Sequence, residues 1–270
     1  MDAVQLGPLV VPMQVALLAA SVLLAHAVVA WFRRARGLDA GPILWKMLLI
    51  GFGVARLVFV LRHHDLYFSE PLSMIDLRDG GVDRLAGFVT AFVVGFELTS
   101  RAKPLRIPLA IAALVGCASF FGGTLLNQAL TSAGAPLPLV QARRLNGSSI
   151  QLRNFVGRPL VINLWATWCP PCRREMPVLK AAQQAHPDVE FVFVHQGESV
   201  ETVKIFLAAH ELQMVNVVID PARQLGTRTG SSGYPTTLFY DAKGRLSLRH
   251  IGELSQATLD EKINRLIKVR

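Results

Sequence analysis

The sequence predicts a membrane α-helical bundle of about four transmembrane helices, followed by a soluble α/β domain. Four long apolar segments fill the first half of the 270 residues, basic residues gather in the short loops between them, and strand-like and helix-like segments alternate in the second half. Only 17% of the residues are charged, whereas soluble domains carry about 25%. The apolar content excludes a disordered chain, and three cysteines are too few for a disulfide-stapled scaffold.

The predicted membrane helices make up a first domain, residues 1–131. The first helix, residues 8–32, contains no charged side chain, and its roughly 25 residues can cross a hydrocarbon core of about 30 Å. The chain starts Met1-Asp2, without the basic start of a cleaved signal peptide, and the apolar run is too long for one. The other helices are expected at residues 43–61, 85–100 and 107–130.

The charges in the loops indicate how this domain is oriented. Seven basic residues lie in the first and third loops: Arg33, Arg34, Arg36, Lys46, Arg101, Lys103 and Arg106. Because loops rich in Lys and Arg stay in the cytoplasm, the acidic second loop (62–84) and everything after residue 130 are expected outside. Residues 132–138 predict a linker, and residues 139–270 an extracytoplasmic domain. The net charge of +9 therefore reflects topology loops and a basic soluble domain and does not indicate nucleic-acid binding.

The second half begins with a strand that leads directly into a helix. Residues 160–166 (LVINLWA) are typical of a strand buried on both faces, and residues 173–184 carry apolar side chains at helical spacing. Further strands are expected at 189–195, 215–219, 236–240 and 246–251, and further helices at 200–210 and 259–269. This order predicts a mixed sheet covered by helices on both faces.

Two cysteines three residues apart, Cys169 and Cys172, lie where the strand turns into the helix. At a helix N-terminus the dipole and the backbone N–H groups favour a thiolate, so the pKa of Cys169 should fall below the ordinary value of about 8.5. Cys172, one turn into the helix, would resolve a mixed disulfide, and Pro171 suits the first helical turn. A zinc site would need a second ligand pair, and this half has no other cysteine. The pattern favours a redox-active dithiol.

Residues 161–177 (VINLWATWCPPCRREMP) and 233–237 (GYPTT) resemble the TlpA/ResA-type thiol–disulfide oxidoreductases, which are membrane-tethered members of the thioredoxin superfamily. The resemblance covers roughly residues 139–270. It implies a thioredoxin-like domain in the periplasm, carried by a multi-pass protein of the bacterial inner membrane. It also implies reduction of protein disulfides by the cysteine pair, with no separate cofactor or metal. The expected partners are extracytoplasmic proteins with disulfides, such as apocytochrome c in cytochrome c maturation.

The same resemblance assigns roles to individual residues. Pro235 matches the cis-proline that faces the dithiol, and its bond would turn the preceding backbone toward the active site. Glu175 matches a carboxyl that tunes cysteine acidity and relays protons, although an exposed glutamate in the first helical turn is the simpler alternative. The expected contacts for an incoming client chain are Trp168, Tyr234 and Pro170.

The direction of electron flow is left open by these residues. A thiol oxidase or a Cu(I)-handling metallochaperone could use the same cysteine pair. A reductase outside the cytoplasm needs an electron supply, and the first half contains only one cysteine, Cys117. A separate DsbD-like membrane donor is therefore implied. Glu198, in the loop after a core strand, is interpreted as a solvent-exposed charge.

The first half is faintly similar to prolipoprotein diacylglyceryl transferases. Residues 53–61 hold Ala-Arg-Leu in an apolar helix, and residues 71–76 and 79–82 follow with a proline and a Gly-Gly pair. That family's catalytic histidine has no counterpart, because the matching stretch, residues 83–87, reads Asp-Arg-Leu-Ala-Gly. We interpret this half as a degenerate, truncated copy that serves as an anchor or docking platform, with lipid modification as the less favoured alternative. Arg56 is its candidate functional residue, since charges within a membrane are costly.

Overall fold

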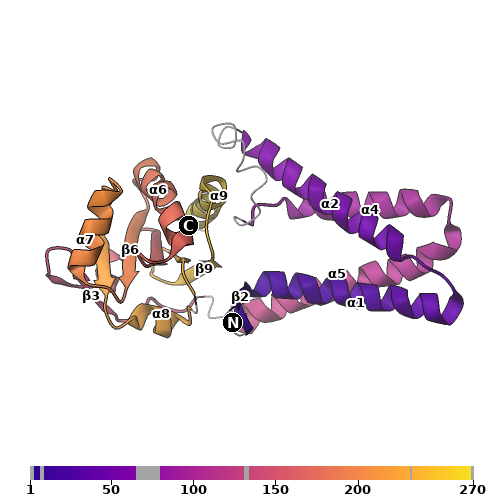
Figure 1. The fold of residues 1–270 in the computed structure, drawn as a ribbon, viewed down its shortest axis with the longest axis horizontal. Coiled ribbons are helices and arrows are strands. Elements are labelled where there is room, and N and C mark those ends of the chain that lie inside the picture. Colours follow the sequence, from indigo (N-terminus) through magenta and orange to yellow (C-terminus); the bar gives the residue numbers. More distant parts are fainter. Residues whose placement is uncertain (1–2, 7–8, 65–79, 131–133, 232, 269–270) are drawn as a thin grey trace. The chain divides into compact units, whose positions relative to one another are not determined.

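The computed structural model describes residues 3–6, 9–64, 80–130, 134–231 and 233–268. The chain divides into a helical unit, Met13–Asn127, and an α/β unit that comprises Met1–Pro12 and Gln128–Arg270 (Figure 1). Most of the acidic loop expected between the second and third helices, and all of the proline-containing segment 71–76, lie outside the described residues.

The first helix, α1 (Met13–Arg36), begins later than the sequence predicts. The residues before it form the strands β1 (Ala3–Leu6) and β2 (Leu9–Pro12) of an antiparallel hairpin. The prediction that the first helix starts at residue 8 is therefore wrong, and two features of the sequence explain the later start. Val10 and Val11 are β-branched and favour a strand, and Pro12 keeps the residue before it extended.

In its described residues the helical unit contains three further helices, α2 (Gly41–Arg62), α4 (Arg84–Ser100) and α5 (Arg106–Leu130), with a short 3-10 turn, η2 (Lys103–Leu105), before α5. Three segments in the described part of the chain are long and apolar enough to cross a membrane: Met13–Arg36, Gly41–Arg62 and Lys103–Asn127. The third predicted span does form a helix, α4. Its 17 residues lie at the lower end of the range of about 17–25 residues that a membrane crossing needs.

Small residues bring these helices together in two pairs. Along α2 and α4, a Cβ added at Gly51 would lie 2.9 Å from the Gly87 carbonyl oxygen, and one at Gly87 would lie 3.0 Å from the Ala55 Cβ. Along α1 and α5, the Ser119 hydroxyl donates to the Ser21 hydroxyl at 3.1 Å. Close approach through glycine, alanine and serine is the usual way in which apolar helices pack inside a membrane.

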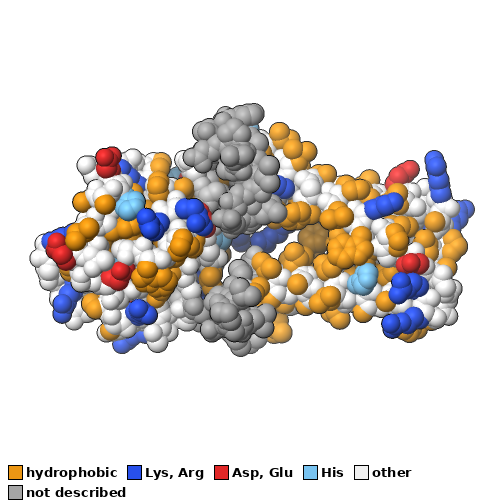
Figure 2. All heavy atoms as spheres, in the orientation of Figure 1, with side chains coloured by type: hydrophobic (Ala, Val, Ile, Leu, Met, Phe, Trp, Pro, Cys, Tyr) orange, Lys and Arg blue, Asp and Glu red, His pale blue; other side chains and the backbone are white. Residues whose placement is uncertain are grey.

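Both helix pairs contribute to one apolar cluster at an end of the unit, made of Ala25, Val29, Ala40, Leu44, Met47, Leu109 and Ala112. The basic residues of the predicted first and third loops lie at this same end, where α1 and α4 finish and α2 and α5 start (Figure 2). Hydrophobic side chains cover the helices along their length in the same view. Exposed examples on α4 alone are Leu85, Phe88, Val89, Phe92, Val93 and Phe96.

The α/β unit is built on a seven-stranded mixed sheet in the order β4-β3-β7-β6-β5-β8-β9. Its parallel centre consists of β5 (Leu160–Trp165), β6 (Glu190–Gln196) and β7 (Val217–Asp220). Antiparallel strands complete it on both sides: β3 (Gln141–Arg144), β4 (Ser149–Gln151), β8 (Thr236–Tyr240) and β9 (Leu246–Ile251). Every residue of β5 is buried, because this strand is covered on both faces of the sheet.

Helices cover both faces of this sheet, which confirms the predicted architecture (Figure 1). One face packs against α6 (Pro170–Ala185), α7 (Val200–Ala209) and α9 (Gln256–Lys268) through residues such as Met176, Phe206 and Ile263. The other packs against α8 (Gln224–Thr229) and the 3-10 turn η3 (Leu152–Phe155) through Leu225 and Leu152.

The described residues of the expected linker, 134–138, belong to the α/β unit. Gly134 N–H donates to the Leu246 carbonyl, Leu246 N–H donates to the Ala135 carbonyl, and Leu137 N–H donates to the Gly244 carbonyl, each at 2.8 Å. The Leu137 side chain is 3% exposed and lies in the core. This stretch therefore extends along the start of β9, so the domain starts earlier than residue 139.

Candidate active site

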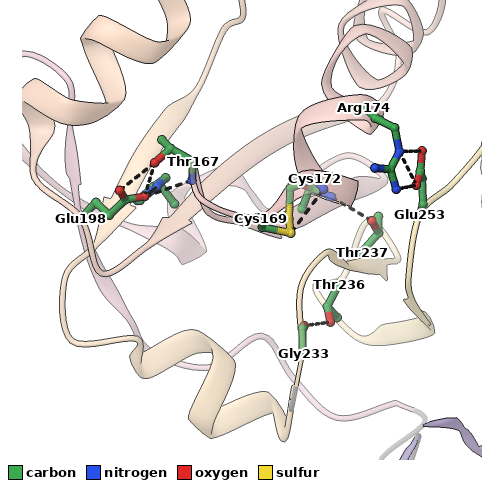
Figure 3. The surroundings of a disulfide bond; sticks show 11 residues. Thr167, Cys169, Cys172, Arg174, Glu198, Gly233, Thr236, Thr237 and Glu253 are labelled. Carbon is green, nitrogen blue, oxygen red and sulfur yellow. Dashed lines mark hydrogen bonds and ion pairs between the residues drawn. A yellow bond between two sulfur atoms is a disulfide. The ribbon is translucent and has the colours of Figure 1, made fainter. Parts of the chain in front are cut away.

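The cysteine pair lies at the junction of the central strand and the helix that follows it. β5 ends at Trp165, α6 begins at Pro170, and Cys169 is the N-cap residue of α6. Cys169 and Cys172 are joined by a disulfide bond (Figure 3). Their side chains are almost fully buried, whereas the neighbouring Trp168 is 59% exposed.

The two prolines between the cysteines limit the backbone donors that can reach Cys169. The Cys172 N–H donates to the Cys169 sulfur at 3.3 Å. Pro170 and Pro171 occupy the first two positions of α6, and neither residue has an N–H group. Among the first three residues of α6, Cys172 is therefore the only one whose backbone N–H can donate a hydrogen bond to the Cys169 sulfur.

Of the predicted client contacts, Trp168 and Tyr234 lie on two loops that touch one another, and Pro170 is the first residue of α6. The rings of Trp168 and Tyr234 pack edge to face with centroids 6.0 Å apart. The peptide bond between Tyr234 and Pro235 is cis, and Pro235 is buried while Pro170 is exposed. Trp168, Pro170 and Tyr234 thus present an accessible rim beside a buried disulfide.

Glu175 is buried on α6, one turn beyond Cys172, with 1% of its surface exposed. Burial raises the pKa of Glu175 well above its usual value, and the negative charge of Glu253 adds to this effect. The Leu254 backbone and the Asn163 side chain act in the opposite direction. Neither carboxyl oxygen has a hydrogen bond of normal geometry within the described part of the chain, so burial dominates and favours the protonated form.

Asn163 and Thr237 are buried polar residues that the sequence analysis did not single out. They face one another across β5 and β8, and the Asn163 Nδ2 group donates to Thr237 Oγ1 at 3.0 Å. The Asn163 carbonyl oxygen, Oδ1, has no hydrogen-bond partner among the described residues. The available signal was the position of Asn163 inside an otherwise apolar central strand.

Glu198 is not the solvent-exposed charge that its loop position suggested. Its carboxylate accepts hydrogen bonds from the Thr167 N–H at 3.0 Å and from the Thr167 hydroxyl at 2.7 Å (Figure 3). The Nε2 atom of His195, a fully buried residue, lies 2.7 Å away. Burial alone would raise the pKa of Glu198, but the Thr167 hydrogen bonds and His195 outweigh it and lower that pKa. Glu198 therefore holds the segment that leads into Trp168 and Cys169.

An ion pair closes the side of α6 that carries Glu175. The Arg174 Nη2 and Glu253 Oε2 atoms lie 2.7 Å apart, and Arg174 Nε contacts both carboxylate oxygens at 3.1 Å (Figure 3). Glu253 belongs to the turn between β9 and α9, so this pair fastens that turn to α6.

Arg56, the candidate of the first half, lies in α2 and is 8% exposed. Its Nη1 group donates to the Gly81 carbonyl oxygen at 2.7 Å. A Cβ at Gly81 would clash with the Phe59 ring and lie 2.9 Å from Arg56 Nη1. Asp83 adds two further links to the end of α2, through its N–H to the Ala55 carbonyl at 3.0 Å and through its carboxylate to Arg62 at 2.8 Å. These contacts hold the segment before α4 against α2.

Within the described residues, no group of three or more His, Cys, Asp and Glu side chains is placed to hold a metal ion. Cys117 lies in α5 as a free thiol.

Comparisons with known proteins agree with this geometry. Residues 132–264 match the Redoxin family model. The chain is 31% identical over 140 residues to the thiol-disulfide oxidoreductase ResA of Bacillus subtilis. The matched region covers 51% of this chain and 76% of ResA. It is 30% identical over 183 residues to the thiol:disulfide interchange protein HelX of Rhodobacter capsulatus. The matched region covers 68% of this chain and 90% of HelX.

A solved structure also matches this half of the chain. The crystal structure of StoA from Bacillus subtilis aligns with a TM-score of 0.41 at 26% identity, covering 47% of this chain and 97% of StoA. The strand-to-helix cysteine pair and the ResA and HelX relatives lead to one conclusion. The chain belongs to the thioredoxin-like thiol–disulfide oxidoreductases of the ResA and HelX type.

Proposed function

We propose that this oxidoreductase is anchored in the bacterial inner membrane by four helices and reduces protein disulfides in the periplasm. The anchoring is supported by three long apolar helices and by α4, which packs along α2 through glycines and exposes a row of apolar side chains. The four crossings also leave both basic loops on one side, as the positive-inside rule requires. The α/β unit would then follow the fourth crossing on the other side.

The Pro-Pro dipeptide between the cysteines is the observation that supports action as a reductant. A CxxC protein becomes a strong oxidant when its reduced thiolate form is stabilised. Within the first turn of α6, the Cys172 N–H is the one backbone donor that reaches the Cys169 sulfur, because the other two positions are prolines. A thiolate at Cys169 therefore receives little stabilisation from the helix terminus, which favours giving electrons away.

The reaction would proceed in two exchanges. The Cys169 thiolate attacks one sulfur of the client disulfide, and the other client sulfur leaves as a thiolate that takes a proton from solvent. Ionised Glu175 then accepts the proton of the Cys172 thiol, and the Cys172 thiolate attacks the Cys169 sulfur of the mixed disulfide. The second client thiolate leaves, so two electrons have passed to the client and the Cys169–Cys172 disulfide remains.

Glu175 suits this step because its pKa is raised by burial. Proton transfer is most efficient between groups of similar pKa, and an ordinary cysteine thiol has a pKa of about 8.5. Trp168, Pro170 and Tyr234 form the rim that would receive the client chain. A separate membrane donor of the DsbD type would reduce the disulfide again, since the helical unit holds only Cys117.

Replacing Pro171 by alanine tests the direction argument. The new N–H at the second helical position can bond the Cys169 sulfur, and a hydrogen bond to a charged group is worth about 1.5–3 kcal/mol. We expect the reduction potential of the cysteine pair to rise by roughly 30–60 mV, measured by equilibration in glutathione or dithiothreitol redox buffers. Pro177→Ala, farther along the same helix, is the matched control and should leave the potential unchanged. An unchanged potential in Pro171→Ala would refute the argument.

Alkylation trapping in the cell tests both the location and the direction. In a Cys117→Ser background, spheroplasts are treated with a maleimide that does not cross membranes. We expect the pair to be mostly reduced and to be labelled before any detergent is added. A pair that is mostly oxidised would indicate a thiol oxidase instead, and labelling only after detergent lysis would place the domain in the cytoplasm.

A further inference from the structure

An imidazole and a carboxylate form a pair beside the turn that leads into Cys169. His195, near the end of β6, is 0% exposed, and Glu198 follows in the loop before α7 with a side chain that is 24% exposed. The His195 Nε2 and Glu198 Oε2 atoms lie 2.7 Å apart. Buried polar groups are almost always hydrogen-bonded, so the pair is built into the fold. The exchange steps at the cysteine pair leave it without a role.

The Glu198 carboxylate accepts hydrogen bonds from two sides. On one side it faces His195, and on the other it faces both hydrogen donors of Thr167, the N–H at 3.0 Å and the hydroxyl at 2.7 Å. An ionised carboxylate is an acceptor only, so each of these three groups points a hydrogen at it. Although burial acts to raise the pKa of Glu198, these bonds lower it. The arrangement therefore belongs to ionised Glu198.

The state of His195 follows from the same contacts. Burial and the positive charge of Arg223 lower the pKa of His195 more than Glu198 raises it, so the ring is neutral near neutral pH. Its one ring hydrogen lies on Nε2, facing Glu198, and Nδ1 has no hydrogen-bond partner among the described residues. The ring packs edge to face on Trp165, its register partner on β5, with centroids 4.8 Å apart. These contacts hold the imidazole in one place and one orientation.

Thr167 connects this pair to the reacting sulfur. It belongs to the turn between β5 and α6, which a hydrogen bond from the Cys169 N–H to the Ala166 carbonyl closes at 3.3 Å. Both hydrogen donors of Thr167 are committed to Glu198 (Figure 3). The next residue, Trp168, is exposed, and its ring contacts the loop of the cis-proline. The position of Thr167 therefore decides where Trp168 and Cys169 stand against a client chain.

We propose that Glu198 and His195 are positioning residues for thiol–disulfide exchange with a client chain. The carboxylate holds the turn that presents Trp168 and Cys169, and the imidazole holds the carboxylate. A displacement of about 1 Å can slow a reaction by about 10²-fold, so a client that has to meet the sulfur and the rim together depends on a fixed turn. A small disulfide, which does not span the rim, has no such need. The proposal rests on the proposed exchange at Cys169, in either direction of electron flow.

The test compares two disulfides in a chain whose only thiol is Cys169, obtained with Cys117→Ser and Cys172→Ser. The full-length protein in detergent is mixed with insulin or with dithiodipyridine, a small uncharged disulfide. The rate at which each forms a mixed disulfide is measured at a pH at which Cys169 is fully ionised in every variant. A change in the pKa of the thiol then does not enter the comparison.

Glu198→Gln is the first variant. Glutamine keeps an oxygen for the Thr167 N–H but turns an NH2 group toward His195. Either two donors face one another, or the ring hydrogen moves to Nδ1, where no described residue accepts it. We expect the insulin rate to fall about 10-fold and the dithiodipyridine rate to stay within about two-fold. Glu201→Gln, the same change on the exposed first turn of α7, is the matched control and should alter neither rate.

His195→Phe tests whether the imidazole holds the carboxylate. Phenylalanine can keep the packing on Trp165 but cannot donate a hydrogen bond, so the insulin rate should fall. Adding Glu198→Gln to this variant should then cost much less than it does in the parent chain, because no donor opposes the new amide. Effects of the two changes that simply multiply would remove His195 from the proposal, since independent sites behave in that way.

Equal losses with both disulfides in Glu198→Gln would show an effect on the reactivity of the sulfur itself and would overturn the positioning role, as would an unchanged insulin rate. If His195→Phe fails to fold, Thr167→Ser and Thr167→Val decide. Serine keeps the hydroxyl and should react with insulin as the parent chain does, whereas valine should react more slowly, and equal rates would reject the proposal. The proposed exchange fails separately, if the parent chain forms no mixed disulfide with insulin.

Discussion

Replacing Cys169 by serine is expected to abolish the reduction of protein disulfides by this chain. The step that fails is the attack on the client disulfide, since a serine hydroxyl remains protonated near neutral pH and cannot replace a thiolate as the nucleophile. The measurement is insulin reduction by the full-length protein in detergent, with dithiothreitol as the electron source. Activity that survives in Cys169→Ser would exclude the cysteine pair as the reacting group.

Two further cysteine variants make this result specific. Cys172→Ser keeps the attacking thiol but removes the resolving one, so a mixed disulfide with insulin should accumulate and be visible on non-reducing gels. Cys117, in α5, takes no part in the proposed exchange, and Cys117→Ser should retain full activity. Equal losses in all three variants would point to misfolding and would contradict the assignment.

Glu175→Gln should have the second largest effect on turnover. Glutamine fills the same buried space but cannot accept the proton of the Cys172 thiol. General acid–base catalysis contributes 10²–10⁴-fold, and we expect the resolution of the mixed disulfide to slow by about 10²-fold. Stopped-flow quenching of the second exchange measures this rate, with the first exchange as the internal control. A loss confined to the first exchange would contradict the role assigned to Glu175.

The same substitution should stabilise the oxidised protein at neutral and alkaline pH. Burial raises the pKa of Glu175 in the folded chain well above its ordinary value of 4.5, so between these two pKa values the folded state binds more protons than the unfolded state. Stability that is complete below about 4.5 is therefore lost as the pH rises through the folded pKa. Glutamine removes this loss. Thermal midpoints should coincide at pH 4 and favour Glu175→Gln at pH 8, and a variant that is less stable at pH 8 would contradict this linkage.

The sequence predicts those parts of the active site whose structure depends on one continuous segment of the chain. The apolar strand 160–165, the cysteine spacing and the proline at position 171 fix the strand, the turn and the start of α6 without help from distant residues. The hairpin of β8 and β9 is equally local, because its turn residues lie between two β-rich segments.

The residues that sequence reasoning missed depend on partners far along the chain. Glu198 looks like a loop charge until β6 brings it beside Thr167, and Asn163 becomes part of the site only because β5 pairs with β8. Residues 134–138 have the composition of a linker, yet they pair with the start of β9. In each case the sheet register decides the contact, and register is a property of the whole fold.

The pairing of α2 with α4 and of α1 with α5 has a consequence for the order in which the chain assembles. α2 and α4 form a neighbouring hairpin, whereas the Ser21–Ser119 contact joins α1 to α5 across most of the helical unit. Contacts between near neighbours form early, and those that close long loops form late. During synthesis, which delivers the N-terminal segments first, α1 can contact α2 early, whereas its contact with α5 can form only after α5 has emerged. The α/β unit follows α5 directly, so completion of the helical unit and the start of folding of the catalytic domain are set by the same stretch of newly made chain.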